Sequence, residues 1–346
     1  MLQQVMTAPG IIEYNEVEVP KPKKGEVLLK MMTIGICGSD IHVNHGQHPF
    51  TSYPITQGHE VSGEIAELGE GVDNFHVGQA VTLQPQVVCG KCHPCRNGKY
   101  NLCEELKVLG FQTTGAGSHF FAIDASKVTP LADGMTHDEG CMIEPLSVGV
   151  HAVRRAGEIE NKGIEGMNVI VLGAGPIGNL IAQVAKGMGA AKVMITDISK
   201  FRLDKAAECG IDICINTMTA DLGDAIAKHF GPDKADVIFD CAGNDITIDQ
   251  AITCSRKGST IVTVAVFADL AKVNMALAND KELCMTNSMM FRNEDYIKAL
   301  ELVASKKVTL KPLVSKHFKF REFKEAYDYI DANRETTMKV IINVQE

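Results

Sequence analysis

The sequence predicts an α/β protein made of a β-rich part and a doubly wound parallel sheet. Up to about residue 145, short apolar runs alternate with glycine- and aspartate-rich turns, which is typical of a small barrel-like β domain. From about 146 to 285, strand-like and helix-like segments alternate, which is typical of a parallel sheet covered by helices on both faces. The length of 346 residues is enough for two such domains.

The first domain is expected to contain residues from both ends of the chain. Helical patterns follow at 294–303 and 320–332, and the apolar run 338–344 is a strand that could complete the first sheet. We therefore assign 1–145 and 286–346 to this domain and 146–285 to the second. Its other predicted strands are 27–32, 61–66, 79–83 and 118–123.

The second domain shows a regular alternation of elements along the chain. Helices are predicted near 145–156, 176–188, 200–209, 219–229 and 245–255. Strands are predicted near 168–172, 192–196, 213–215, 235–240 and 259–266.

A glycine-rich turn joins the first strand and helix of this alternation. Gly173 permits a tight turn, Gly175 lets the backbone approach a pyrophosphate, and Gly178 lets the helix pack closely on the strand. Pro176 and Ile177 open the helix, whose N–H groups and dipole favour an anion. The pattern predicts a dinucleotide site, although an ordinary strand–helix turn without ligand has the same outline.

An acidic residue follows at the end of the next strand. Asp197 lies 24 positions after Gly173, close to the ~20-residue offset at which an acid binds a ribose 2′-hydroxyl. A carboxylate would repel a 2′-phosphate, so the position favours NAD over NADP. Lys200 and Arg202 follow closely and leave NADP open.

Four cysteines occur within one short, polar segment at about 86–106. Their thiolates can close a tetrahedral zinc site, and a loop too polar to bury a core gains order from a metal. Such a closed site leaves no open position and is structural. An iron–sulfur cluster or chance clustering are the alternatives, and the spacing differs from the usual ferredoxin runs. The four are Cys89, Cys92, Cys95 and Cys103.

A second group of metal-binding residue types is spread over the first domain. Cys37 offers a thiolate and His59 an imidazole, and a carboxylate can supply the third protein ligand. Glu60 and Glu144 are the acid candidates. Each residue alone is more often a core or surface residue, but beside a dinucleotide-binding domain they predict a catalytic zinc with one open position.

Composition narrows the class of protein and its surroundings. Hydrophobic content of 45% and charged content of 22% are ordinary for a globular protein, and no run reaches the ~18 apolar residues of a membrane helix. A net charge of -9 argues against nucleic acid or anionic membranes as partners. Eleven cysteines without an export signal predict reduced thiols and a cytoplasmic location.

Several of these motifs resemble those of zinc-dependent medium-chain dehydrogenases, in particular the polyol (sorbitol-type) branch. The resemblance spans nearly the whole chain, with the motifs in the family's order. It implies a GroES-like catalytic domain, a Rossmann domain that binds NAD, and reversible oxidation of a secondary alcohol to a ketone. The matching segments are 35–42, 58–60, the four-cysteine lobe, 143–151 and 173–178.

The resemblance also implies roles for single residues at the metal. Cys37 and His59 match catalytic zinc ligands, and Glu60 matches an acid that binds zinc or lies just behind it. Glu144 stands where ethanol-type enzymes have a cysteine ligand, as in the polyol branch. Which acid binds the metal at rest stays open. Arg202 matches a basic residue that packs on the adenosine.

Further residues match the proton path and the substrate pocket of the family. Ser39 and His42 match relay positions, although a turn residue and a surface helix residue would look the same. Phe111 and Arg292 are the candidate substrate contacts. Asn293 replaces the tyrosine that follows the arginine in polyol dehydrogenases, which puts that part of the pocket in doubt, and Arg292 could equally be a surface ion-pair partner.

The substrate is predicted only as a class, a polyol or sugar-derived small molecule. L-threonine 3-dehydrogenase and 2,3-butanediol dehydrogenase are the alternatives within the same chemistry. A non-catalytic relative would be expected to lose the metal or glycine motifs, and all are present. The resemblance implies a homodimer or homotetramer, which in this family often forms through the last strand of the Rossmann domain, and 259–266 is expected to be that strand. In the polar entrance loop 44–50, His45 and His48 are expected to be solvated.

Overall fold

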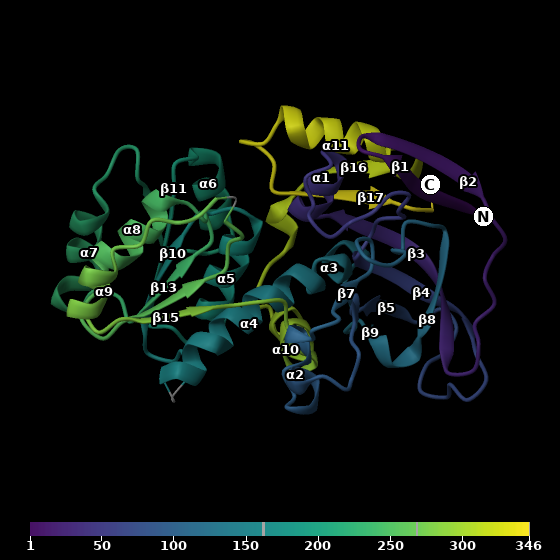
Figure 1. Cartoon of the computed structure of the whole chain (residues 1–346), viewed down its shortest axis with the longest axis horizontal. Helices are drawn as coiled ribbons and strands as arrows, with labels where there is room; N and C mark the ends of the chain where they lie inside the picture. The colour runs from purple at the N-terminus through teal and green to yellow at the C-terminus, as the bar shows by residue number, and fades with distance from the viewer. Residues whose placement is uncertain (161–162, 268, 346) are drawn as a thin grey trace. The chain divides into compact units, whose positions relative to one another are not determined.

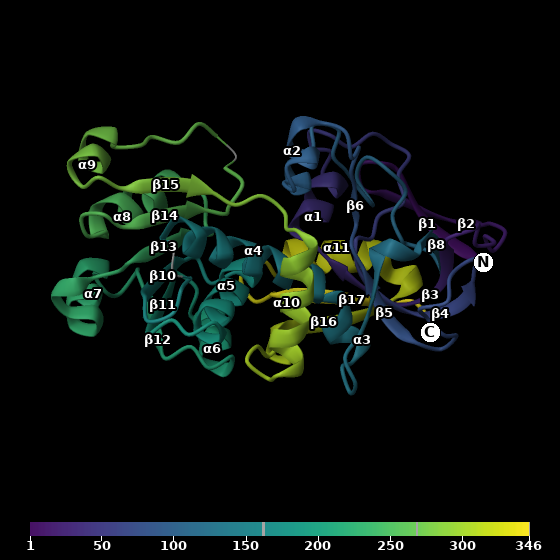
Figure 2. The same ribbon diagram turned by 90° about the horizontal axis from the view of Figure 1, so that it is seen from below.

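The computed structural model describes residues 1–160, 163–267 and 269–345, which form two compact units. The first unit contains Met1–Glu144 and Val314–Glu346, and the second contains Pro145–Leu313. Figure 1 and Figure 2 show the elements of each unit from two perpendicular directions. Each unit is built on its own sheet.

The first unit contains a seven-stranded mixed sheet with the order β16-β17-β3-β4-β5-β9, in which β8 also pairs with β3. Two small two-stranded sheets, β1–β2 and β6–β7, lie outside it. The strands are β1 (Leu2–Ala8), β2 (Ile11–Glu16), β3 (Glu26–Ile36), β4 (Glu60–Leu68), β5 (Ala80–Leu83), β6 (Gln86–Val87), β7 (Lys107–Val108), β8 (Phe120–Asp124), β9 (Val128–Pro130), β16 (Val314–Lys319) and β17 (Lys339–Asn343). The helices are α1 (Gly38–Asn44), α2 (His93–Arg96), α3 (His137–Cys141) and α11 (Phe323–Ala332), with 3₁₀ turns at Tyr100–Leu102, Ala125–Lys127 and Phe320–Glu322.

The end of the chain returns to this first sheet, as the apolar run 338–344 predicted. Val340 of β17 pairs antiparallel with Ile36 of β3. Helix α11 precedes this strand and places Phe323 and Tyr327, one turn apart, on its buried face. The Tyr327 hydroxyl donates to Gln57 Oε1 at 2.7 Å, so the buried phenol has a partner. Helix and strand together close the core of the first unit.

The second unit contains a six-stranded parallel sheet with the order β12-β11-β10-β13-β14-β15. The chain runs outward from β10 to β12 and then returns to β13 beside β10, so the order reverses between these two strands. The strands are β10 (Asn168–Leu172), β11 (Lys192–Asp197), β12 (Ile213–Asn216), β13 (Val237–Asp240), β14 (Thr260–Thr263) and β15 (Cys284–Asn287). The helices are α4 (Ile143–Glu160), α5 (Pro176–Gly187), α6 (Lys200–Glu208), α7 (Leu222–Phe230), α8 (Asp245–Cys254), α9 (Met275–Asp280) and α10 (Asn293–Ala304), with 3₁₀ turns at Gly231–Asp233 and Lys311–Leu313.

Alternating side chains explain how helices cover this sheet. Ile170 and Leu172 of β10 pack in one apolar cluster with Ile226 of α7 and Ile248 of α8. Because successive strand residues point to opposite faces, Val171 faces the other layer of helices. The apolar run of β10 is therefore buried on both faces, as expected for a parallel sheet covered by helices on both sides.

Two features of the second unit differ from the sequence prediction. The predicted strand 259–266 is the shorter β14, which is an inner strand, and the edge of the sheet is β15. Strand β15 was not predicted, because its four residues Cys284–Asn287 are mostly exposed and show no apolar run. The expectation that 259–266 is the last strand of the Rossmann domain is therefore wrong, because β15 follows it.

The boundary between the units also differs from the predicted one. Residues 286–313 were assigned to the first domain, whereas they group with the second unit. Asp295 of α10 is buried and accepts hydrogen bonds from Arg154 on α4, at 2.6 Å to Nε. The backbone N–H of Thr309 donates to Gln183 Oε1 of α5 at 2.8 Å. These polar contacts tie α10 and the segment after it to the second unit, and hydrophobic periodicity in the sequence does not reveal them.

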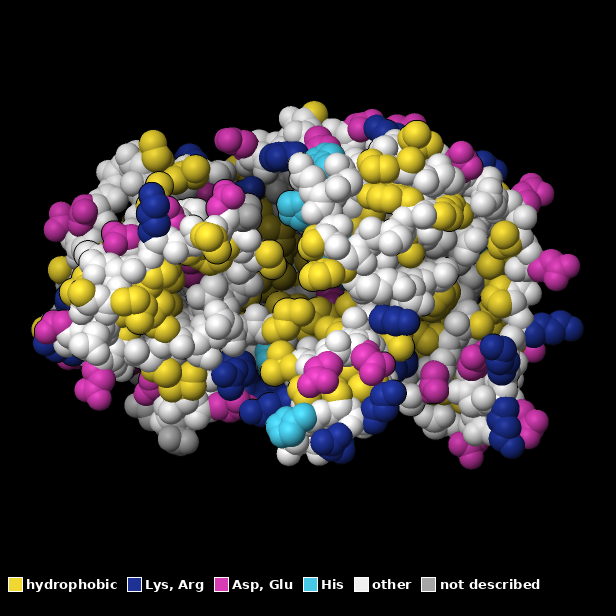
Figure 3. Space-filling model, viewed as in Figure 1, with side chains coloured by type: hydrophobic (Ala, Val, Ile, Leu, Met, Phe, Trp, Pro, Cys, Tyr) yellow, Lys and Arg dark blue, Asp and Glu magenta, His cyan; other side chains and the backbone are white. Residues whose placement is uncertain are grey.

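The surface carries both signs of charge. Figure 3 shows acidic and basic side chains interspersed on the face in view, in a chain of formal net charge -9. Among residues 1–160, 163–267 and 269–345, every helix is too short or too polar to cross a membrane.

Candidate active site

Cys37 lies where strand β3 ends and helix α1 begins. Its backbone N–H donates to Asp40 Oδ2 at 2.9 Å, so an acid in the first turn of α1 fixes the residue before the helix. Cys37 is a free and partly buried thiol. The junction therefore presents this thiol from a well-defined backbone position.

The start of strand β4 brings His59 and Glu60 to Cys37. One ligand atom from each residue lies within 4.8 Å of the other two. Nδ1 of His59 is buried and makes no hydrogen bond with any described residue, since Asp40 Oδ1 is 3.6 Å away. A buried nitrogen without a partner is unfavourable, and thiolate, imidazole and carboxylate are the ligand types that zinc takes. The group therefore fits a zinc ion.

The electrostatics of this pocket also favour a cation. Burial lowers the pKa of His59, but the nearby carboxylate of Asp40 and the thiol of Cys37 raise it by more, to about 10. Negative surroundings that stabilise a protonated imidazole also stabilise a metal ion in the same place.

Glu60 is held by a buried lysine. Lys339 Nζ donates to Glu60 Oε1 at 2.8 Å and Oε2 at 2.6 Å, and to the carbonyl oxygen of Ile36 at 3.1 Å. Both side chains are almost fully buried. Gly35 pairs with Glu60 across the sheet, and a Cβ at Gly35 would lie 2.5 Å from Glu60 Oε2. Residues of strands β3 and β17 thus position the carboxylate of Glu60, which lies at the start of β4.

Glu144 lies beside the group but outside it. It is buried in the first turn of α4, where burial raises its pKa to about 7, with His59 opposing this shift and Glu60 adding to it. These mutual charge effects indicate that the groups are close. In the described part of the chain, however, the clustered ligand atoms are those of Cys37, His59 and Glu60.

The two predicted relay residues lie on helix α1, directly after Cys37. Ser39 is in the first turn and partly buried, and His42 is in the last turn and exposed. The structure therefore places both on the helix that begins at the metal group.

The ring of Phe111 contacts two histidine rings, one of which belongs to the metal group. The ring of Phe111 lies 4.9 Å from that of His59, between centroids, and 4.8 Å from that of His48, to which it is nearly parallel at 14°. Phe111 is buried and His48 partly buried. The predicted substrate residue Phe111 is thus in contact with the metal-group histidine, and His48 is less solvated than its loop sequence suggested.

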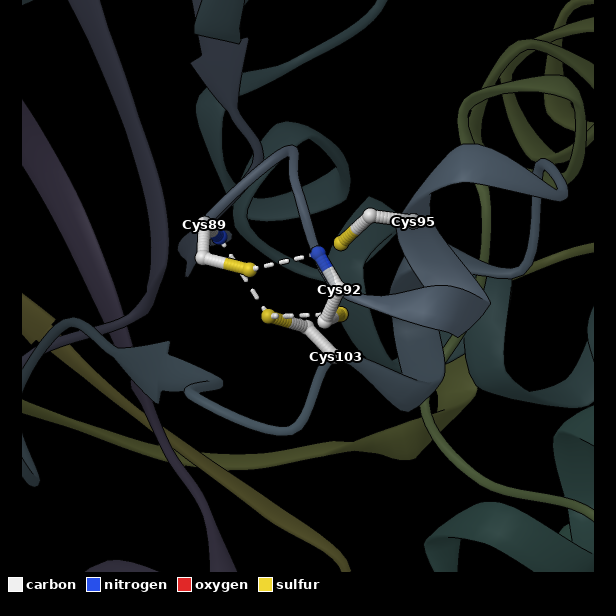
Figure 4. A group of neighbouring side chains, drawn as sticks. All are labelled: Cys89, Cys92, Cys95 and Cys103. Carbon is white, nitrogen blue, oxygen red and sulfur yellow. Dashed lines mark hydrogen bonds between the residues drawn. The ribbon is translucent and has the colours of Figure 1, made fainter.

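The four cysteines of the polar lobe converge on one point, as Figure 4 shows. One sulfur atom from each lies within 4.8 Å of the others. The Cys92 Sγ and Cys103 Sγ atoms are 3.9 Å apart, and the backbone N–H of Cys89 donates to Cys103 Sγ at 3.3 Å. Four soft ligands at this spacing fit a closed tetrahedral zinc site.

The ionisation of the thiols in the lobe also suits a bound cation. Backbone N–H donors from Glu104 and Cys95 lower the pKa of Cys92 to about 6. Desolvation and the neighbouring thiols raise the pKa of Cys95. Without a cation the four sulfur atoms cannot all be thiolates, and a bound zinc ion would remove that conflict.

The glycine-rich turn lies at the C-terminal end of β10, where the order of the parallel sheet reverses. Gly173 has φ +97°, and a Cβ at Gly178 would lie 1.9 Å from the Gly173 carbonyl oxygen, so both need glycine for the fold. Gly175, the N-cap of α5, has an ordinary φ and open space around its Cβ position. Pro176 and Ile177 form the first turn of α5 and are partly exposed. The space at Gly175 fits a close ligand.

Asp197 at the end of β11 is linked to the same turn. Its Oδ2 accepts from the backbone N–H of Ala174 at 2.7 Å, and its Oδ1 accepts from that of Ser199 at 2.8 Å. The Arg202 Nη1 atom is 3.9 Å from Asp197 Oδ2. The acid therefore positions the glycine-rich turn as well as the start of α6.

Arg292 takes part in ion pairs within the second unit. Its Nη2 lies 3.1 Å from Glu158 Oε1, and its Nε lies 3.1 Å from Glu294 Oε1. It precedes α10 as the N-cap residue. The ion-pair alternative raised by the sequence is thus realised, whereas a contact with substrate stays a prediction.

The sequence prediction missed Asp40 and Lys339, which contact the residues of the metal group. Asp40 is three residues after Cys37, a capping position that could have marked it. Lys339 is a lone cation inside the final apolar strand, and a buried charge requires a partner. Neither signal identifies Glu60 as that partner.

Comparison with known proteins defines the class. Residues 23–133 match the alcohol dehydrogenase GroES-like domain family, and residues 176–305 match the zinc-binding dehydrogenase family. Sorbitol dehydrogenase of Halalkalibacterium halodurans is 36% identical over 337 residues, covering 96% of each chain. L-galactonate-5-dehydrogenase of Escherichia coli K12 is 32% identical over 334 residues, also covering 96% of each.

A solved structure agrees over the whole chain. An alcohol dehydrogenase from Escherichia coli CFT073, crystallised with its cofactor NADH, superposes with a TM-score of 0.90 at 30% identity and covers 99% of each chain. The chain therefore belongs to the zinc-binding medium-chain alcohol dehydrogenases, in the branch of the polyol and sugar-acid dehydrogenases. This confirms the family and the pair of GroES-like and Rossmann-type domains that the motifs predicted.

Proposed function

We propose that this protein oxidises a secondary hydroxyl of a polyol or sugar-derived acid to a ketone, with NAD as hydride acceptor and zinc as catalytic metal. The observation that supports it best is the convergence of Cys37, His59 and Glu60 in a chain that also carries the glycine-rich turn. The relatives named for sorbitol and L-galactonate support the substrate class.

Zinc held by Cys37 and His59, with Glu60 or Glu144 as the acidic ligand, would supply Lewis acidity that makes the substrate hydroxyl more acidic. The chain's own task is to hold that hydroxyl and receive its proton. Ser39 follows Cys37 directly and is the proposed first acceptor, and His42, at the exposed end of the same helix, is the proposed exit to solvent.

The second unit is proposed to bind NAD at the glycine-rich turn. The space at Gly175 and the backbone N–H groups of α5 would receive the pyrophosphate. Asp197 disfavours a 2′-phosphate at the ribose, and Arg202 is proposed to lie against the adenosine. The relative crystallised with NADH supports this choice. Kinetics that prefer NADP by a wide margin would overturn it.

A substrate panel tests the proposed reaction. NADH formation would be measured with sorbitol, xylitol, galactitol, an aldonate, L-threonine and 2,3-butanediol as substrates. A polyol or sugar acid should have the highest kcat/KM, with Phe111 beside the reacting end and Arg292 as the proposed contact to a remote group. Strict preference for threonine or for 2,3-butanediol would overturn the polyol assignment.

We further propose a homodimer or homotetramer in the cytoplasm. The edge strand β15 carries the exposed side chain of Met285, and Val266 and Leu270, in the segment before it, are 96% and 97% exposed. Unpaired strand edges and exposed apolar side chains favour association with a second copy. All eleven cysteines are free, which suits a reducing compartment. Light scattering of the purified protein tests the assembly, and a monomer would contradict it.

A further inference from the structure

The ring stack beside the metal group places a loop histidine close to where substrate would bind. Phe111 contacts both His59 and His48, and its ring is nearly parallel to that of His48. All three residues belong to the first unit. The stack fixes the plane of the His48 ring, because face-to-face packing on a buried phenylalanine restricts its rotation.

Local hydrogen bonds determine which nitrogen of His48 carries the proton. The backbone N–H of Phe50 points to Nδ1 at 3.4 Å, and Thr51 Oγ1 is 2.8 Å from the same atom. A backbone N–H can only donate, so Nδ1 is an acceptor and the neutral ring carries its proton on Nε2. Burial, with the charges of His42 and His59, lowers the pKa of His48 and keeps the ring neutral.

The Nε2–H group of His48 is therefore a hydrogen-bond donor in a fixed ring plane. No described residue accepts a hydrogen bond from it. The rings of His48 and of the metal-group histidine both contact the ring of Phe111. A sugar alcohol carries hydroxyl groups beyond its reacting carbon that could accept from such a donor, whereas a small monohydric alcohol carries none.

We propose that His48 is a specificity-determining residue that donates a hydrogen bond from Nε2 to a substrate hydroxyl remote from the reacting carbon. The inference rests on the proposed polyol dehydrogenase function and deepens it. It predicts that the enzyme distinguishes polyhydroxylated substrates from simple secondary alcohols through this loop residue.

Selectivity measurements test the proposal. Purified zinc-loaded wild type and His48→Phe, which keeps an aromatic ring on Phe111 but removes the donor, would be assayed with NAD. The substrates are 2-butanol and whichever of sorbitol, xylitol and galactitol the wild type oxidises fastest. We expect kcat/KM for the polyol to fall about tenfold to hundredfold, chiefly through a higher KM, and that for 2-butanol to stay the same.

Two further variants complete the design. His48→Gln restores an N–H donor and should recover part of the polyol preference. His45→Phe makes the same change at a neighbouring loop histidine, whose Nε2 pairs with Asp331 at 2.7 Å, and should leave the preference unchanged. Thermal unfolding confirms that each variant is folded, and if His48→Phe is not, His48→Leu replaces it.

The outcomes separate this inference from the function on which it rests. A wild type that oxidises none of the polyols overturns the proposed function and the inference together. A wild type that oxidises a polyol, with a folded His48→Phe that keeps the wild-type ratio of polyol to 2-butanol, overturns the role of His48 alone.

Discussion

Lys339 is the residue on which the acid of the metal group depends. Its ammonium group contacts both oxygens of Glu60, and the two side chains are almost fully buried. A buried ion pair adds little stability over a pair of apolar residues, but removing one partner leaves an uncompensated charge in the core. The pair therefore fixes Glu60 in one position beside the metal rather than strengthening the fold as a whole.

Replacing this lysine should destabilise the protein strongly. We expect Lys339→Met to lower the free energy of unfolding by about 3–5 kcal/mol, because Glu60 loses its only charged hydrogen-bond donor among the described residues. Lys339→Arg keeps the positive charge and should cost much less. Chemical denaturation of the three proteins measures this, and equal stability of Lys339→Met and wild type would refute the pairing.

The types of the metal-binding residues could be read from the sequence, whereas their arrangement could not. Cys37 and His59 are recognisable by their ligand chemistry and neighbouring motifs. The choice between Glu60 and Glu144 depends on the register of β3 against β4 and on Lys339, which lies far away in the sequence. His48 was predicted to be solvated because it lies in a polar loop. Its contact with the distant Phe111 cannot be read from the sequence.

At the scale of elements, the turn between β10 and α5 contains glycines with two different purposes. A Cβ at Gly178 would lie 1.9 Å from a backbone oxygen, whereas a Cβ at Gly175 would meet nothing within 4 Å. The fold itself therefore requires Gly178. The open space at Gly175 is where we propose that the pyrophosphate of NAD approaches the backbone.

These two positions form a matched pair for mutation. Gly178→Ala should lower the free energy of unfolding by about 1–3 kcal/mol through overpacking. Gly175→Ala should leave stability nearly unchanged but weaken NADH binding at least tenfold, since the methyl group occupies the ligand's space. Chemical denaturation and NADH fluorescence titration measure the two effects. Unchanged NADH affinity in Gly175→Ala would show that the cofactor does not approach this residue.

A buried carboxylate ties helix α10 to helix α4, in addition to the apolar side chains that α10 buries. Asp295 accepts from Arg154 Nε at 2.6 Å, lies 2.8 Å from His151 Nδ1, and caps the backbone N–H of Arg292 at 2.8 Å. These bonds lower the pKa of Asp295 even though burial opposes the shift. The carboxylate is therefore ionised. It accepts hydrogen bonds from α4 and caps the start of α10.

Removing this carboxylate should loosen the second unit. We expect Asp295→Ala to lower the free energy of unfolding by about 3–5 kcal/mol, because Arg154 keeps a partly buried charge without its main partner. Zinc content should not change, since every cysteine and histidine of the two metal groups lies in the first unit. A variant as stable as wild type would contradict this role of Asp295.

Periodic elements were predictable from the sequence, and elements fixed by polar contacts were not. Strand β10 and helix α5 match their predicted ranges closely, because apolar runs and glycine signals define them. Strand β15 lacks both signals, and the contact of Asp295 with α4 leaves none, so one edge of the sheet and the boundary near 286–313 were missed. The periodicity of apolar residues predicts that a helix or strand is present. It does not predict as well which part of the protein that element packs against.

At the scale of the whole molecule, the two metal groups lie in the same unit but are built from different residues. The four-cysteine lobe is a local loop closed by its own sulfur atoms, and the Cys37 group is assembled from strands of the main sheet. Losing one should therefore leave the ligands of the other in place.

A single cysteine replacement tests this independence. Cys95→Ser should reduce the zinc content from two ions per chain to one, because a lobe with three thiolates holds zinc far less tightly. It should also lower the unfolding temperature by several degrees while leaving the zinc of the Cys37 group in place. Elemental analysis after gel filtration measures the content. Two retained ions would show that the lobe does not need all four sulfur atoms.

The central claim is that Cys37, His59 and an adjacent acid hold the zinc that makes this chain an NAD-dependent polyol dehydrogenase. Comparing wild type with Cys37→Ser for zinc content and for NADH formation from a polyol tests it most directly. The account predicts two zinc ions and turnover in wild type, against one ion, an intact fold and at least a thousandfold lower kcat/KM in Cys37→Ser. A folded Cys37→Ser protein with undiminished polyol oxidation would contradict it.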